Sequence, residues 1–280
     1  MILIADGGST KTSWALLSID GVLKINTSGI NPMVHTPELI QKVIREELLS
    51  VLYEEISKID LLAFYGAGCN ENGCRILTHE LQTVFQCEIS CSSDLAGSAI
   101  ATIGDGEGIV SILGTGSNSG FYSKGVLKDH IPSLGYILGD EGSGSYLGKQ
   151  LLADYLKKQM PANLAKHFED SYHLHETDVI EAVYRKAKPN QYLASFVPFI
   201  VANSDEEYCK SLVKQAFSLF FQRNICEYKG YKNYPLAFTG SVAFGFRNFL
   251  EETATKYGTH ISEILQDPVD GMINYFKKRL

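Results

Sequence analysis

The sequence lacks the features that mark membrane and secreted proteins. Its longest apolar stretch, 192–202, contains Ser195 and Pro198 and falls short of the roughly 20 residues that cross a bilayer. The apolar run at the start, Met1 to Ile4, is far shorter than a signal-peptide core and has no basic residues before it. We therefore expect a cytoplasmic protein that does not bind a membrane.

Cysteine pairs with Cys-x-x-Cys spacing are also absent, although the chain has six cysteines. Their spacing forms no regular framework, and a chain of 280 residues does not need disulfide staples. Lone histidines and cysteines are more often packing or surface residues than ligands, which argues against a zinc site built from His173, His175 and scattered cysteines. Reduced, non-ligating thiols are the expectation.

An excess of positive charge is missing as well. Lysine and arginine number 25 against 32 aspartates and glutamates, a net charge of −7, and such a chain repels the phosphate backbone of nucleic acids. Hydrophobic residues make up 45% and charged residues 20%, which is typical of a globular protein and excludes disordered, collagen-like and coiled-coil chains. A length of 280 residues fits one large domain or two modest ones.

The hydrophobic pattern predicts a similar opening at two places in the chain. Short apolar strands separated by glycine-containing turns occur first at 2–5, 12–18 and 22–25, and again at 108–113, 119–123 and 126–131. Between these openings the spacing predicts helices at 37–57, 75–85 and 96–103 and strands at 60–65 and 87–92. We place the boundary between two domains, 1–105 and 106–280, where the pattern restarts, with the last helix able to pack back on the first domain.

Beyond the second opening the chain is predicted to be mostly helical. Helices are expected at 144–158, 178–187, 206–228, 244–257 and 269–278, with one strand at 235–239. The last helix ends in Lys277, Lys278 and Arg279, where positive charge favours a helix carboxyl end.

Three glycine-containing turns follow apolar strands: Asp6 to Thr12, Gly114 to Asn118, and Gly240 to Val242. Glycine lets the backbone approach a phosphate closely, and free amides and hydroxyls donate hydrogen bonds to its oxygens. A single turn of this kind is commonly only a turn, but three together predict phosphate binding. The spacings of the P-loop and of the dinucleotide fingerprint are not met, because Ser143, Gln150 and Ser119 stand where those motifs need other residues.

These turns, with Ser92 to Gly97 and Gly139 to Ser143, resemble in order and content the motifs of the N-acetylglucosamine kinase branch of the actin, hexokinase and heat-shock-chaperone superfamily. The resemblance spans nearly the whole chain. It implies an α/β fold of two ribonuclease H-like domains, the actin-like ATPase fold, with a cleft for nucleotide and substrate between them. The cofactors implied are ATP and Mg²⁺, and the resemblance also implies a homodimer.

The resemblance assigns a task to each matching residue. Asp6 corresponds to the position that holds magnesium, and Asp94 to the general base that takes the proton of the sugar hydroxyl. The nucleotide and its phosphates would be bound by Gly8, Ser9, Thr10, Lys11, Thr12, Gly114, Thr115, Gly116, Gly240 and Ser241. Asn31, Asn118 and Asp140 would bind the sugar.

Ordinary structural roles compete with several of these assignments. Asp94 precedes a predicted helix and would also suit its N-cap, Asn31 would also suit a turn before Pro32, and a glycine-serine pair at 240–241 suits a bare helix start. For Glu141 we favour a cap of the helix beginning near Ser143.

The implied activity is ATP-dependent phosphorylation of an amino sugar. The favoured acceptor is the 6-hydroxyl of N-acetylglucosamine. One alternative is an ATPase of the kind that activates 2-hydroxyacyl-CoA dehydratases, but the residues before Gly114, Ser111-Ile112-Leu113, lack the cysteine of an iron–sulfur ligand. The other alternative is a non-catalytic regulator. Regulators of this fold carry a DNA-binding helix-turn-helix, and we expect no segment for one beside the motifs. Sequence does not separate amine from acetamide sugars.

Overall fold

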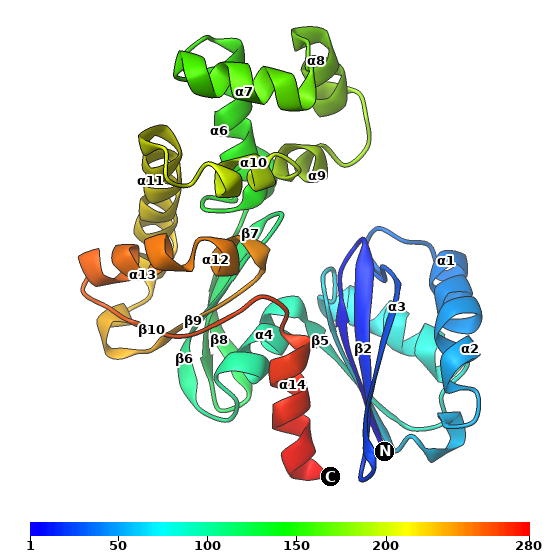
Figure 1. The fold of residues 1–280 in the computed structure, drawn as a ribbon. Helices are drawn as coiled ribbons and strands as arrows, with labels where there is room; N and C mark the ends of the chain where they lie inside the picture. The colour runs from blue at the N-terminus through cyan, green and yellow to red at the C-terminus, as the bar shows by residue number, and fades with distance from the viewer. The chain divides into compact units, whose positions relative to one another are not determined.

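The computed structural model describes all 280 residues and divides them into two compact units (Figure 1). The first unit contains Met1–Gly106, Tyr122–Leu127 and Asp267–Leu280, and the second contains Glu107–Phe121 and Lys128–Gln266. The first break in the chain, after Gly106, lies one residue from the boundary expected at 105. The second unit does not run to the end of the chain, however, because Asp267–Leu280 packs into the first.

A mixed five-stranded sheet forms the centre of the first unit. Its strands are β1 (Ile2–Gly7), β2 (Lys11–Ser18), β3 (Gly21–Ser28), β4 (Leu61–Gly66) and β5 (Glu88–Ser93), in the order β3-β2-β1-β4-β5. The pairs β1/β2 and β2/β3 are antiparallel, whereas β1/β4 and β4/β5 are parallel. The carboxyl ends of β1, β4 and β5 therefore meet at one edge of the sheet.

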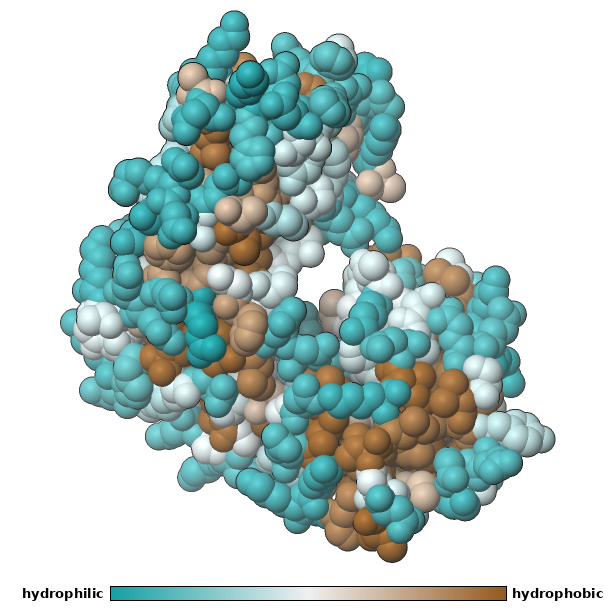
Figure 2. Space-filling view, viewed as in Figure 1, coloured by the Kyte–Doolittle hydropathy of each residue, from teal (hydrophilic) through white to brown (hydrophobic).

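Helices cover both faces of this sheet, which explains why β1 is an unbroken apolar run. The helical segments of the unit are α1 (Pro37–Lys42), a π-helical segment (Val43–Leu48), α2 (Leu49–Leu52), a 3₁₀ turn (Ile56–Lys58), α3 (Glu71–Gln82), α4 (Asp94–Thr102), α14 (Val269–Phe276) and a 3₁₀ turn (Lys277–Arg279). Leu3 and Trp14 face a core shared with α1 to α3, while Ile4 and Leu17 face a core shared with α14. Figure 2 shows hydrophobic residues gathered over the region of β2.

The helix predicted over 37–57 differs from the structure in its middle and its end. A π-helical segment, Val43–Leu48, joins α1 to α2, and regular helix ends at Leu52. The wider turn keeps Val43, Ile44 and Leu48 buried together. The hydrophobic spacing indicated the buried face, but it did not reveal the change in hydrogen-bond pattern.

The second unit is built around a second five-stranded sheet with the same connectivity. Its strands are β6 (Glu107–Leu113), β7 (Ser117–Ser123), β8 (Val126–Ile131), β9 (Leu236–Thr239) and β10 (Ile261–Leu265), in the order β10-β9-β6-β7-β8. As in the first sheet, three consecutive strands lie side by side, and the two later strands extend the sheet beyond the first of these three. Strand β9 is parallel to β6, and β10 is parallel to β9. The repeated opening in the sequence is thus a repeated sheet topology.

The rest of the second unit is helical. Its helices are α5 (Gly135–Leu138), α6 (Gly144–Leu156), α7 (Ala162–Tyr172), α8 (Glu176–Tyr184), α9 (Pro189–Ala194), α10 (Val197–Ala202), α11 (Glu207–Arg223), α12 (Ser241–Gly245) and α13 (Arg247–Lys256), with 3₁₀ turns at Ile225–Glu227 and Tyr231–Asn233. Side chains over α7 and α8 are mostly hydrophilic on the outside (Figure 2). No helix of the protein combines the length and apolar character needed to cross a bilayer.

Four helices of this unit, α5, α7, α9 and α10, and one strand, β10, were not predicted. Of the β10 side chains only Ile264 is buried, because the strand lies at the edge of its sheet. Its apolar residues, Ile261, Ile264 and Leu265, do not alternate with polar ones, so the period-two pattern of a half-buried strand is missing.

Candidate functional site

The turn between β1 and β2 is closed by backbone hydrogen bonds. The Gly8 amide donates to the Lys11 carbonyl over 2.9 Å, and the Gly29 amide donates to the Thr10 carbonyl over 3.0 Å. The side chains of Thr10 and Lys11 are exposed, and Gly8 and Ser9 are partly exposed. The turn therefore presents the predicted phosphate-binding residues at the surface of the first unit.

Thr12 is the exception among these residues. It is fully buried, and its hydroxyl accepts a hydrogen bond from the Ile30 amide over 3.0 Å. That hydroxyl fixes the segment after β3 to β2 and faces the interior. The phosphate contact predicted for the Thr12 side chain is corrected accordingly, because a side chain without solvent exposure does not reach a ligand at the surface.

Asn31 supports the same turn through hydrogen bonds of its side chain. It is buried, its amide nitrogen donates to Ser9 Oγ over 2.7 Å, and its amide oxygen accepts from the Met33 amide over 3.0 Å. The turn role that competed with sugar binding is therefore present, and Asn31 also links its turn to the first phosphate loop. Its contact with a sugar stays a prediction.

Three carboxylates gather at the carboxyl edge of the first sheet. Asp6 lies near the end of β1, level with Tyr65 of β4, which is in turn level with Ser92 of β5. Asp94 follows two residues after Ser92, at the start of α4. The sheet register thus explains how residues 6 and 94 come to one place.

The third carboxylate, Asp267, is a functional candidate that the local sequence did not indicate. Desolvation, and then the negative charges of Asp267 and Asp94, raise the pKa of Asp6 from 3.8 to about 7, while Lys11 opposes the shift. Lys11 Nζ lies 3.9 Å from Asp267 Oδ2. Asp267 also accepts a hydrogen bond from the Val269 amide over 3.0 Å. An Asp-Pro pair before a helix was its only local signal.

Such a group of repelling oxygen donors suits a hard divalent cation. Mg²⁺ is bound in proteins by one or two carboxylates together with waters and substrate phosphates. Asp6 fits that role, because it stands beside two further negative charges and next to the accessible Gly8–Lys11 turn. The residues present therefore fit the magnesium site implied by the sequence.

The N-cap of α4 is Ser93 and not Asp94. Ser93 Oγ accepts a hydrogen bond from the Ala96 amide over 3.2 Å, whereas Asp94 is the first helical residue and its Oδ1 accepts from the Leu95 amide over 2.8 Å. The N-cap position itself therefore belongs to Ser93, while Asp94 accepts a hydrogen bond from an amide of the first helical turn. The role of Asp94 as general base stays a prediction.

The second glycine turn, in the other unit, docks on the start of α6. The Gly114 amide donates to the Gly116 carbonyl over 3.0 Å and closes the turn. The amides of Gly144 and Ser145 donate to the carbonyls of Gly114 and Thr115 over 2.8 and 3.0 Å. The segment after Asp140 thus holds the turn in place.

Asp140 packs directly against this turn. It is buried, and its Oδ1 accepts a hydrogen bond from the Ser117 amide over 3.2 Å. Burial raises the pKa of Asp140 above its ordinary value. Asp140 is therefore fixed beside the second glycine turn, and its contact with a sugar stays a prediction.

Glu141 does not cap α6, so the role we favoured for it is wrong. The cap is Ser143, whose Oγ accepts from the Tyr146 amide over 3.2 Å. Glu141 is buried and pairs with Arg223, the last residue of α11, at 2.5 Å. Its charge is neutralised by a residue 82 positions away in the chain, which local sequence does not indicate.

Asn118, on β7, has a partner that sequence also did not indicate. Its Oδ1 lies 2.8 Å from His130 Nε2 on β8 and accepts from the Ser119 amide over 3.0 Å. Asn118 is partly exposed, so its amide nitrogen can still donate to a ligand. His130 is therefore a positioning candidate for the predicted sugar ligand Asn118.

The third turn lies against the second. Gly240 has a φ of +111°, and a Cβ added there would stand 2.4 Å from the Leu113 carbonyl oxygen and 3.2 Å from the Gly114 nitrogen. Only glycine fits so close an approach with such a φ. The two turns predicted to bind nucleotide, 114–116 and 240–241, are therefore adjacent in the second unit.

We expect Gly240→Ala to destabilise the protein by about 2–4 kcal/mol, because the new methyl group meets backbone and the φ disfavours alanine. The midpoint and slope of urea unfolding measure the effect. Gly245→Ala is the matched control: it lies in α12, and its Cβ would meet nothing nearer than Val201 at 3.8 Å. Equal stability of the two variants would show that the close approach at Gly240 is absent.

Comparison with known proteins places these features in context. No model of a protein family matches the sequence. The structure of a candidate N-acetylglucosamine kinase from Porphyromonas gingivalis is similar over 99% of both chains, with a TM-score of 0.95 and 41% sequence identity. A candidate N-acetylglucosamine kinase from Chromobacterium violaceum is similar over 98% of both chains, with a TM-score of 0.76 and 18% identity.

A more distant likeness concerns the fold alone. A non-polymerising mutant of MamK bound to AMPPNP matches over 99% of this chain and 98% of its own, with a TM-score of 0.55 and 13% identity. Together with the two mixed five-stranded sheets of the same order, these matches confirm the predicted fold class, the actin-like ATPase fold of two ribonuclease H-like domains.

Proposed function

Because the chain belongs to the N-acetylglucosamine kinase-like branch of the actin-like ATPase superfamily, we propose that it transfers the γ-phosphoryl group of ATP to an amino sugar. The proposed acceptor is the 6-hydroxyl of N-acetylglucosamine. The observation that carries the proposal is the group of three carboxylates beside the first glycine turn, in which the pKa of Asp6 is raised to about 7. This group suits magnesium-dependent phosphoryl transfer, which depends on positioning and on charge neutralisation.

Asp6 is the proposed magnesium residue. When bound, Mg²⁺ neutralises charge on the phosphate oxygens. Without the cation Asp6 stands beside the unfavourable charges of Asp267 and Asp94, which favour its protonated form, and a bound cation would offset that repulsion and keep the carboxylate ionised. The amides of the Gly8–Lys11 turn and the Lys11 ammonium add positive potential for the phosphates.

Asp94 is the proposed general base. As the sugar oxygen bonds to the γ-phosphorus, the bond from phosphorus to the bridging oxygen of ADP breaks, and the hydroxyl proton passes to the Asp94 carboxylate. Such a base contributes about 10²–10⁴-fold to a rate. Asp94 suits this role because it starts a helix that Ser93 already caps.

The second unit supplies the remaining proposed contacts. The turn of Gly114, Thr115 and Gly116 would bind the transferred phosphate through its backbone, and Gly240 and Ser241 would contact the adenosine. Asp140 and Asn118 would hydrogen-bond the sugar hydroxyls. A buried polar partner such as Asp140 discriminates strongly against sugars that lack the matching group.

A coupled ADP-release assay tests the proposal. We expect ADP to form with N-acetylglucosamine and Mg²⁺, and to fall to background without sugar or with 6-deoxy-N-acetylglucosamine, which lacks the acceptor hydroxyl. Glucose, glucosamine, N-acetylmannosamine and N-acetylmuramic acid complete the panel. ADP release at the same rate with and without sugar would exclude the kinase and favour an ATPase.

A further inference from the structure

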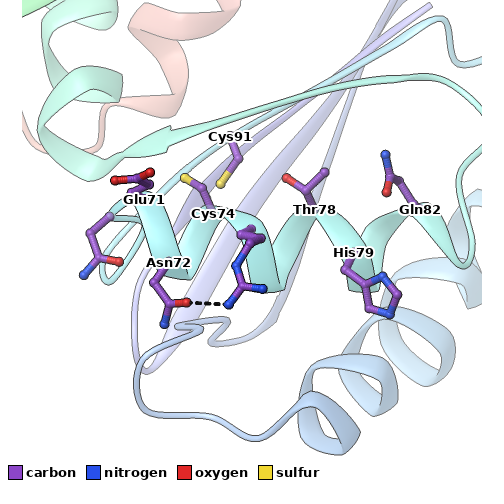
Figure 3. Close-up of a pocket in the computed structure, with 9 residues that line it drawn as sticks. Glu71, Asn72, Cys74, Thr78, His79, Gln82 and Cys91 are labelled. Atoms are coloured by element: carbon purple, nitrogen blue, oxygen red, sulfur yellow. Dashed lines mark hydrogen bonds between the residues drawn. The ribbon is translucent and has the colours of Figure 1, made fainter.

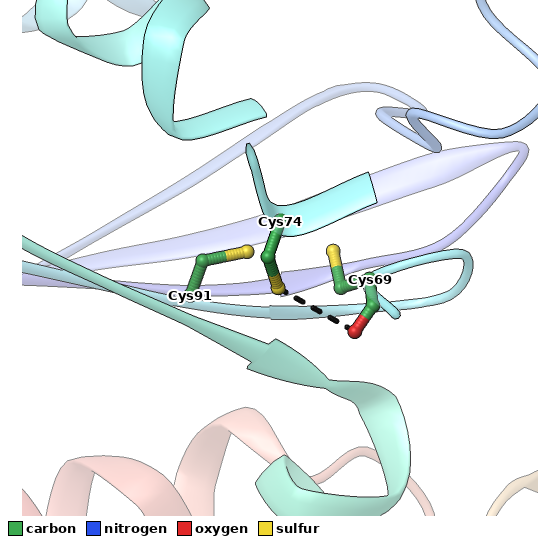
Figure 4. A group of neighbouring side chains, drawn as sticks. All are labelled: Cys69, Cys74 and Cys91. Atoms are coloured by element: carbon green, nitrogen blue, oxygen red, sulfur yellow. Dashed lines mark hydrogen bonds between the residues drawn. The ribbon is translucent and has the colours of Figure 1, made fainter. Parts of the chain in front are cut away.

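Three of the six cysteines meet at one point of the first unit, although they come from three different segments. Cys69 lies in the loop after β4, Cys74 in α3, and Cys91 on β5. Their three Sγ atoms all lie within 4.8 Å of one another (Figure 4). We call these three residues the thiol cluster.

The thiol cluster is closed on one side and open on the other. Cys69 is buried, with 4% of its surface exposed. Cys74 and Cys91 line an open cavity of about 960 Å³ along α3, with Arg75 and His79 among the other lining residues. Figure 3 shows the sulfur atoms of Cys74 and Cys91 close together, while His79 lies farther along α3 and turns away from them. An ion entering from the cavity would meet three sulfur ligands and keep an open position for water.

We propose that the thiol cluster binds one thiophilic metal ion, Zn²⁺ or Cu⁺, through the three Sγ atoms of Cys69, Cys74 and Cys91. Thiolates select these ions over hard cations such as Mg²⁺. A zinc–sulfur bond measures about 2.3 Å, so three sulfur atoms around one ion lie about 4 Å apart. The separations of up to 4.8 Å therefore need to close by less than about 1 Å.

Metal binding accounts for the cluster better than the other chemistry of thiols does. A disulfide would use two of the three sulfurs, whereas one metal ion uses all three and releases their protons.

The ion would link the loop after β4, α3 and β5 through its three sulfur ligands. Cys74 Sγ already donates to the Cys69 carbonyl over 3.5 Å, so loop and helix are in contact without the ion. An ion that binds only the folded protein stabilises it, and the stabilisation grows with the logarithm of the ratio between the ion concentration and the dissociation constant. We therefore expect Zn²⁺ to raise the melting temperature of the protein.

The test is a Zn²⁺ titration of the fully reduced protein against a chromophoric chelator. Excess Mg²⁺ is present, so that oxygen sites such as Asp6 do not contribute. We expect one Zn²⁺ per chain, and about 100-fold weaker binding in each of Cys69→Ser, Cys74→Ser and Cys91→Ser, at least the loss seen for outer-sphere changes in metal sites. Cys87→Ser is the matched control: this partly buried cysteine of the same unit lies outside the cluster, and its replacement should leave the affinity unchanged.

Folding of the variants is checked by far-ultraviolet circular dichroism, and Co²⁺ gives an independent spectroscopic readout. Co²⁺ bound to the wild-type protein should show a thiolate-to-metal charge-transfer band that Cys74→Ser and Cys91→Ser weaken. Two results would overturn the proposal. One is equal Zn²⁺ affinity in the wild type and in a folded triple serine variant, and the other is iron and sulfide in the purified protein.

Discussion

Asp94→Asn lowers the rate of sugar phosphorylation by about 10²–10⁴-fold and leaves ATP binding in place, because the amide does not accept the hydroxyl proton. The fold should persist. Asparagine keeps an oxygen that can accept the 2.8 Å bond from the Leu95 amide, and Ser93 continues to cap α4. Loss of a negative charge at the first turn of a helix costs only about 0.3–1 kcal/mol.

Steady-state turnover measures the rate of phosphorylation, and calorimetric titration with an ATP analogue measures nucleotide binding. Asp178→Asn is the matched control, since Asp178 is also a first-turn aspartate, on α8, and accepts a hydrogen bond from the His175 amide over 3.0 Å. It should show the same small loss of stability and normal turnover. Wild-type turnover in Asp94→Asn would remove the residue from the chemistry.

Asp6→Asn is expected to stabilise the metal-free protein while abolishing most of its activity. The pKa of Asp6 in the folded protein is about 7, against an ordinary value of 3.8. A folded-state pKa above the unfolded value means that the free energy of unfolding falls as the pH rises from about 4 to about 7. A pKa raised from 3.8 to about 7 lowers the free energy of unfolding by about 4 kcal/mol once the carboxylate is ionised. Asparagine does not ionise, so the variant does not lose this stability.

Urea unfolding with a chelator present tests this at several values of pH. At pH 8 the variant should be more stable than the wild type by up to about 4 kcal/mol, and the difference should shrink steadily as the pH is lowered towards 4. Added Mg²⁺ should stabilise the wild type and not the variant, since binding to the folded state alone raises stability. A difference that does not depend on pH would mean that the Asp6 carboxylate is neither desolvated nor repelled.

These two variants also separate the roles of neighbouring carboxylates. Asp6→Asn should weaken the dependence of ATP binding on Mg²⁺, whereas Asp94→Asn should not, because only Asp6 is assigned to the cation. Together they distinguish a failure of the magnesium site from a failure of proton transfer.

Much of the architecture followed from local pattern. Alternating and continuous apolar runs marked most of the strands, and the repeated opening indicated two similar sheets. The turns at Gly8, Gly116 and Gly240 were found because glycine signals a special backbone by itself, and a strand followed by such a turn is a local feature. Edge strand β10 was not predicted, because its three apolar residues lack the alternation that marks a half-buried strand.

The sequence by itself determined the residue types available for phosphate and cation chemistry, their order along the chain and the family to which that order belongs. Only the tertiary structure decided which residues meet. It brought Asp267 to Asp6, Arg223 to Glu141, His130 to Asn118, and three dispersed cysteines to one point. The physical reason is that charge repulsion, ion pairing and shared ligation act over a few ångströms of space, whereas these partners are separated by between 5 and 261 positions in the chain.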